Sequence, residues 1–117
     1  MRILWLSRHE PLPVQVEALK KAFGEDIEIV HDPERIQDAD DVVSRKEQVG
    51  AEEVVIVAPL HIVASLLQRG IKPLRADMEA VDNPAIADTE ASGRLYRFVG
   101  FSRLVNVVVE TEKIVER

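Results

Sequence analysis

The sequence predicts an α/β protein: a small three-layer sandwich with a mixed sheet. Three observations lead to this fold class. Apolar, strand-like runs alternate with helical patterns over the first 70 residues, so the first part reads β-α-β-α-β-α. The run in the middle of that part is continuously apolar, which is typical of a strand buried on both faces of a parallel sheet. After residue 71 the β-prone runs follow one another with no room for a helix, which indicates antiparallel strands at one edge.

The first three elements come from short-range patterns. Arg2–Leu6 is a strand-forming apolar run. Pro13 is placed to begin a helix over Val14–Phe23, where apolar residues recur at helical spacing. A glycine then stops the helix. Asp26–Val30 alternates charged and apolar residues, which predicts a half-exposed strand near the edge of the sheet.

The next elements continue the alternation. Asp38 or Asp40 can cap a second helix that runs to Val49. The stretch Glu52–Pro59 holds five apolar residues between charge and proline and predicts the buried central strand. Leu60–Gln68 has an almost wholly apolar inner face and predicts the third helix.

The last third changes character. Residues 72–81 alternate small or apolar side chains with charged ones, as expected of a strand with one wet face. Residues 82–93 are polar and predict a loop. Residues 95–101 and 104–115 are β-prone and form either a hairpin around Gly100–Arg103 or one long bent strand.

Composition limits the classes of function. A chain of 117 residues predicts one domain, residues 1–117. No window approaches a membrane span and the N-terminal apolar run is too short for a secretory signal, so a cytoplasmic protein without membrane contact is expected. The absence of cysteine removes disulfides and thiolates, and a net charge of -6 argues against duplex nucleic acid as a partner. A charged fraction of 31% favours a thermophilic source.

A candidate site follows from the predicted topology. Ligands of open α/β sheets bind outside the carboxyl ends of parallel strands, where the strand order reverses. If the order begins 2-1-3, the first strand delivers Ser7, Arg8 and His9 to the same edge as His61, which follows the third strand. Arg8 suits a phosphate or carboxylate, and Ser7, His9 and His61 are the candidate catalytic residues, able to donate hydrogen bonds or move protons.

The alternative is a purely structural role, in which these polar residues only cap exposed backbone groups at strand ends and helix starts. His31, before Asp32 and Pro33, fits an ordinary turn. No histidine pair has metal-ligand spacing, so no metal is expected, and no glycine-rich phosphate loop is present, so no cofactor is expected.

Arginines elsewhere extend the candidate ligand site. Arg97 lies among Tyr96, Phe98 and other aromatic or basic residues, and Arg75 lies on the wet face of the strand over 72–81. Both are candidate ligand-binding residues on a basic lip beside the crevice. The alternative is a core strand with a solvated arginine edge.

The chain resembles a known group in these segments. A first strand ending in Leu6-Ser7-Arg8-His9, a middle segment Val54–His61 and an aromatic strand Tyr96–Phe101 are similar to small CRISPR-associated accessory proteins of the CARF-like and ring-nuclease group, and to uncharacterised small Rossmann-like proteins of mobile elements. The resemblance implies a Rossmann-like fold and recognition or cleavage of a cyclic oligonucleotide at the strand-end crevice, usually across a dimer.

Two functions therefore stand side by side. The first is a nucleotide-ligand protein, acting as a binder or as a slow metal-independent phosphodiesterase. The second is a non-enzymatic homo-oligomeric interaction protein, a homodimer, suggested by the thin apolar face of the second helix and by the run Val105–Val109.

Overall fold

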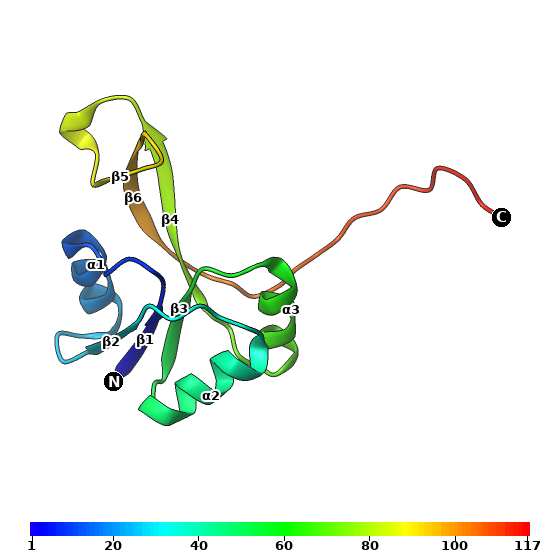
Figure 1. Ribbon diagram of the computed structural model, residues 1–117, viewed down its shortest axis with the longest axis horizontal. Helices are drawn as coiled ribbons and strands as arrows, with labels where there is room; N and C mark the ends of the chain where they lie inside the picture. Colours follow the sequence, from blue (N-terminus) through cyan, green and yellow to red (C-terminus); the bar gives the residue numbers. More distant parts are fainter.

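The computed structural model describes residues 1–117 and is built on one six-stranded mixed sheet (Figure 1). The strand order is β2-β1-β3-β4-β6-β5. The strands are β1 (Arg2–Leu6), β2 (Glu28–Asp32), β3 (Glu53–Ile56), β4 (Leu74–Val81), β5 (Thr89–Ala91) and β6 (Arg94–Arg103). The general α/β class is confirmed, and the strand order begins 2-1-3, which is the condition on which the candidate site depends.

The parallel half of the sheet is centred on β1. β2 and β3 flank it in parallel, and Leu6 at the end of β1 lies beside Asp32 on one side and Ile56 on the other. The carboxyl ends of all three strands therefore meet at one edge.

Helices cover both faces of this half. They are α1 (Pro13–Phe23), α2 (Ala39–Val49) and α3 (Leu60–Gln68). Side chains of α2 and α3 pack on the face that presents Leu4, Leu6, Val54 and Ile56. Leu19 and Phe23 of α1 pack on the opposite face, which presents Ile3, Trp5 and Val55. Alternate residues of the same strands thus feed two separate cores, because successive strand side chains point to opposite faces.

Local signals account for the helix starts. Pro13 is the first residue of α1, and the Gln15 side chain accepts a hydrogen bond from the backbone N–H of Leu12 at 2.8 Å. Asp38 is the residue that caps α2, since its carboxylate accepts from the N–H of Asp41 at 2.8 Å. Each of these contacts satisfies a donor that the first turn of the helix leaves unpaired.

None of the three helices has the length and the apolar composition that a membrane span requires.

The second strand lies further along the chain than predicted. β2 begins at Glu28 and extends through His31 to Asp32, because all five of its residues find partners along β1. The assignment of His31 to a turn after the strand is therefore wrong: sheet pairing carries the strand past the charged residues that the pattern suggested would end it.

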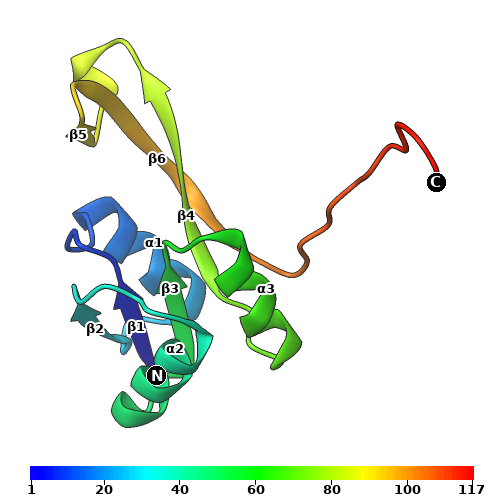
Figure 2. The same ribbon diagram turned by 45° about the vertical axis from the view of Figure 1, so that its right-hand side comes forward.

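β4 and β6 form a two-stranded ribbon that projects past the rest of the sheet (Figure 2). β4 meets β3 at a single register pair, Val55 with Leu74, and runs on beside β6. The register shifts opposite Asp77 and Met78, where Val99 is the extra residue of a β-bulge. Gly100 next to it has a φ of +150°, which residues with side chains rarely adopt.

The predicted loop over 82–93 is partly structured. It contains a short 3₁₀ turn, Pro84–Ile86, and the three-residue strand β5. A two-residue turn joins β5 to β6, with Ser92 and Gly93 both at positive φ. A strand of three polar or small residues has no hydrophobic alternation that could predict it from sequence, so only its pairing with β6 identifies it.

The predicted strand over 104–115 is absent. β6 ends at Arg103, no hairpin turns at Gly100–Arg103, and residues 104–117 adopt no regular structure. The β-prone residues beyond Arg103 do not form a strand because no neighbouring strand lies beside them to accept their hydrogen bonds.

Candidate functional site

The end of β1 forms a short loop held by its own polar groups. The N–H of His9 donates to the hydroxyl oxygen of Ser7 at 3.3 Å, and the indole N–H of buried Trp5 donates to the carbonyl of His9 at 2.9 Å. The side chains of Arg8 and His9 remain exposed. We call Ser7, Arg8 and His9, together with His61, the rim.

His31 supports this loop from the neighbouring strand. Its Nε2 lies 2.8 Å from the carbonyl oxygen of Ser7, and in the sheet register it pairs with Trp5. With Nε2 protonated, the ring donates to that carbonyl. Sequence reasoning missed this residue, although a signal exists: Ile27, Ile29 and His31 continue one alternation, which places all three on the same face of β2.

His61 reaches the same edge from β3. That strand ends at Ile56, Pro59 is the N-cap residue of α3, and His61 lies exposed in the first turn of the helix. No side chain caps this helix, and the N–H groups of Leu60 and His61 donate to no protein acceptor. The fold brings Ser7–His9 and His61 to the same edge of the sheet, but no hydrogen bond or ion pair joins them.

The three candidate arginines differ in their surroundings. Arg8 makes no ion pair. Arg75 pairs with Asp77 at 2.8 Å, and Arg97 pairs across the ribbon with Glu79 at 3.1 Å. Arg97 lies toward the far end of the ribbon rather than at the end of β1, whereas Arg75 is near the start of β4. Only Arg8 combines a place on the rim with a guanidinium that no carboxylate neutralises.

The contacts of Asp77 explain why Arg75 is a poor candidate for a ligand-binding residue. The Ser102 hydroxyl donates to the carboxylate of Asp77, and Arg75 adds a charged hydrogen bond; together they outweigh the effect of burial and hold the pKa of Asp77 below its ordinary value. The carboxylate stays ionised and keeps Arg75 occupied.

An apolar groove of about 460 Å³ adjoins the rim. It lies between the end of β3, the start of α3, the start of β4 and the first residues after β6. Nine of its eleven lining residues are hydrophobic, and the lining is Ile56, Val57, Ala58, Leu60, Val63, Arg75, Ala76, Leu104, Asn106, Val107 and Val108. His61 follows Leu60 directly, so the groove and the rim share the segment that joins β3 to α3.

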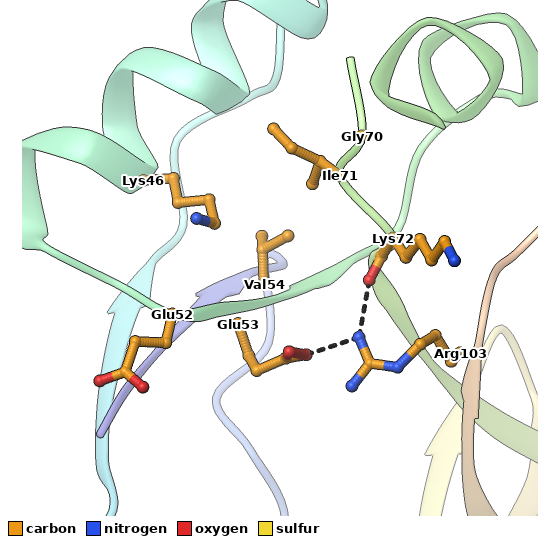
Figure 3. A pocket seen from close by; sticks show the side chains of 8 residues that line it. All are labelled: Lys46, Glu52, Glu53, Val54, Gly70, Ile71, Lys72 and Arg103. Atoms are coloured by element: carbon orange, nitrogen blue, oxygen red, sulfur yellow. Dashed lines mark hydrogen bonds and ion pairs between the residues drawn. The ribbon is translucent and has the colours of Figure 1, made fainter. Parts of the chain in front are cut away.

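A second cavity, of about 340 Å³, lies at the opposite edge of the sheet (Figure 3). It mixes charges of both signs, and Arg103 crosses it to bind Glu53 at 2.8 Å and the carbonyl of Lys72 at 2.9 Å. This cavity faces the amino end of β3, whereas ligands of α/β sheets bind at the carboxyl ends. We therefore regard Arg103 as a structural tie between β3, β4 and β6. No cluster of three or more histidine and acidic side chains is arranged to hold a metal ion.

Comparisons with protein-family models, curated proteins and solved structures return no match to this chain.

Proposed function

We propose that the protein binds a phosphate-bearing nucleotide ligand at the rim. The observation that carries the proposal is an unpaired, exposed arginine, Arg8, at the carboxyl edge where β1 and β3 run side by side. α3 begins at that edge, and the N–H groups of Leu60 and His61 in its first turn have no protein acceptor. The N-terminus of a helix favours an anion. Two kinds of anion-binding group are thus available on neighbouring connections.

Each rim residue has a role in this proposal. Arg8 binds phosphate oxygens. Ser7 accepts a hydrogen bond from the N–H of His9, which leaves its hydroxyl proton free to donate to the ligand. His9 orients the ribose or the phosphate to be cleaved, and His61 assists from the first turn of α3. The bond from His31 to the Ser7 carbonyl keeps the loop in one conformation.

We further propose a cyclic oligonucleotide as the ligand class, with slow cleavage as the reaction. A ribose 2′-hydroxyl attacks the adjacent phosphorus, the new 2′-O–P bond replaces the P–O5′ bond, and Arg8 stabilises the extra negative charge. His61 accepts the hydroxyl proton, and His9 as imidazolium protonates the leaving 5′ oxygen. Few groups are needed, because positioning supplies much of the rate. The resemblance to small Rossmann-like, CRISPR-associated proteins and helices on both faces of a β2-β1-β3 core support this reading.

Cyclic oligoadenylates of several ring sizes test the proposal. We expect at least one ring size to raise the melting temperature, and chromatography to show its slow conversion to a linear product. Arg8→Ala should weaken binding about ten- to a hundredfold, since it removes a charge-assisted contact. Arg94→Ala is the matched control: Arg94 is also exposed and without an ion pair, but it lies at the ribbon turn, and binding should not change. No stabilisation by any ring size would contradict the proposal.

A second candidate function is that of a non-enzymatic homodimer. The observation that favours it is the set of aliphatic side chains exposed after β6, among them Val105 and Val109. A dimer that binds no cyclic oligonucleotide, with Arg8→Ala unaffected in the cell, would favour this reading over the first.

A further inference from the structure

The segment after β6 leaves the body of the protein beyond the groove-lining residue Val108. Its last backbone hydrogen bond is from the N–H of Leu104 to the carbonyl of Pro73, at 2.8 Å, and residues 105–117 make none. The chain then runs away from the sheet in an irregular, drawn-out course (Figures 1 and 2). We call residues 105–117 the tail. An extended backbone without pairing partners is a strand edge available to another chain.

The tail also exposes large aliphatic side chains among its charged residues. The side chains of Val109, Ile114 and Val115 are 81%, 88% and 86% exposed. Such exposure of several large aliphatic residues in one segment marks an interaction surface rather than the scattered apolar residues of any protein surface.

The groove beside the rim shows the complementary feature. Val57 and Leu60, on its lining, are 73% and 69% exposed, among the highest values for large apolar side chains outside the tail. β4 also has a free edge here, because β3 pairs with it only at Leu74 and ends while β4 continues to Val81. An incoming strand would find both an apolar floor and backbone partners.

We propose that the part of the tail beyond Val108, residues 109–117, of a second copy of this chain lies in this groove, and that the exchange is reciprocal in a two-fold dimer. One contact, repeated by the symmetry, covers both the groove and the tail of each chain. The incoming strand adds to the free edge of β4, as in recognition by strand addition. Arg75 on the groove wall already pairs with Asp77, so this contact depends on apolar side chains and on backbone pairing.

The chain's own tail does not lie in the groove beyond Val108. Residues 104–108 already form the outer wall of the groove, so residues 109–117 would have to reverse direction to enter it. The stretch 107–115 contains no glycine, proline or asparagine to make such a turn. Nine extended residues span up to about 30 Å, more than the 24 Å shortest dimension of the molecule. The tail is long enough to lie along a neighbour.

The oligomeric state tests this proposal. We expect the full chain to sediment as a dimer at micromolar concentration. Leu60→Asp and Val109→Asp should each raise the dimer Kd by at least about tenfold, because each places a carboxylate in an apolar contact. Ile86→Asp is the matched control, since Ile86 is 51% exposed but lies near the far end of the ribbon, and its Kd should equal that of the parent chain. Circular dichroism verifies that each variant is folded, as expected at exposed positions.

Disulfide trapping identifies the surfaces directly. The chain has no cysteine, so single cysteines are unambiguous. A mixture of the Leu60→Cys and Val109→Cys chains should give the mixed disulfide on mild oxidation, and a mixture of Ile86→Cys with Val109→Cys should not.

A monomer at all concentrations would overturn the proposal, as would a dimer that either aspartate variant leaves intact. Both experiments use the protein without nucleotide. Their failure would therefore leave the proposed ligand site standing, and failure of ligand binding would leave the dimer standing.

Discussion

Arg45 fixes the connection between β2 and α2 through five hydrogen bonds. Its guanidinium donates to both carboxylate oxygens of Asp41, to the carbonyls of Glu34 and Arg35, and at 3.5 Å to Asp32. The side chain is only 15% exposed. A planar fork of donors is required here, which lysine cannot supply.

Among the partners of Arg45, Asp41 is the residue whose protonation is most affected. We call Arg45 and its hydrogen-bond partners the Arg45 cluster. Burial raises the pKa of its carboxyl group, but the hydrogen bond from the N–H of Gln37 and the charge and hydrogen bonds of Arg45 outweigh burial, so the pKa lies below its ordinary value. A pKa that folding lowers adds stability above the unfolded pKa, and that stability is lost as the pH falls through the folded pKa.

We therefore predict a pH-dependent effect of Asp41→Asn. Near neutral pH the free energy of unfolding should fall by about 1–3 kcal/mol, because hydrogen bonds between charged groups are lost. The difference from the parent chain should shrink as the pH falls below about 4, where the parent carboxyl also becomes protonated. Urea unfolding over this pH range measures both effects.

Asp40→Asn is the control for that experiment. Asp40 neighbours Asp41 in the first turn of α2 and pairs with Arg69, but its side chain is 76% exposed. Its replacement should cost less than about 1 kcal/mol, as is usual for exposed ion pairs. Equal losses for the two variants would show that the first turn responds to charge alone and not to the Arg45 cluster.

The β4–β6 ribbon depends on the bulge at Val99 and Gly100. The extra residue bends β6, and the ribbon turns back onto the body where Phe101 packs against Trp5, with ring centroids 6.1 Å apart. Phe98 packs on Phe101 at 5.0 Å. The aromatic contacts thus tie the ribbon to the core face that α1 covers.

We predict that Gly100→Ala destabilises the protein by about 1–3 kcal/mol. The cause is backbone strain at a φ of +150°, since a β-carbon added to Gly100 would meet no atom within 4 Å. Urea or thermal unfolding measures the loss. Val99→Ala, at the half-exposed neighbouring position, should change stability by less than about 1 kcal/mol. A neutral Gly100→Ala would show that the bulge can relax to another register.

The molecule as a whole consists of a closely packed parallel half and a ribbon joined to it by few contacts. The contacts that join the two halves include one register pair between β3 and β4, the Trp5–Phe101 and Gln15–Met78 contacts, and the bonds that Arg103 makes to Glu53 and to the carbonyl of Lys72. Regions with so few connections can open without global unfolding.

We predict that Arg103→Ala loosens the ribbon selectively. Amide hydrogen exchange in β4 and β6 should quicken about fivefold, as expected from the loss of about 1 kcal/mol at a partly exposed pair. Exchange in β1 and β3 should change little. Arg97→Ala, which breaks the Arg97–Glu79 pair within the ribbon, should not reproduce this pattern. A uniform increase across both halves would mean that the protein opens only as a unit.

Local patterns were sufficient for the parallel half except for the position of β2. The apolar run ending at Leu6, Pro13 at the start of α1 and Asp38 at the start of α2 each act within a few residues, so their effects can be read in order along the chain. The same reasoning placed Ser7–His9 and His61 at one edge, because adjacent parallel strands end on the same side.

Only the tertiary structure decided where pairing stops and what supports the rim. His31 joins β2, and its ring meets the Ser7 carbonyl, because β1 offers partners along its full length. The β-prone residues after Arg103 remain unpaired because no strand lies beside them. β-propensity is set by one stretch of chain, but a strand exists only where a distant stretch completes its hydrogen bonds.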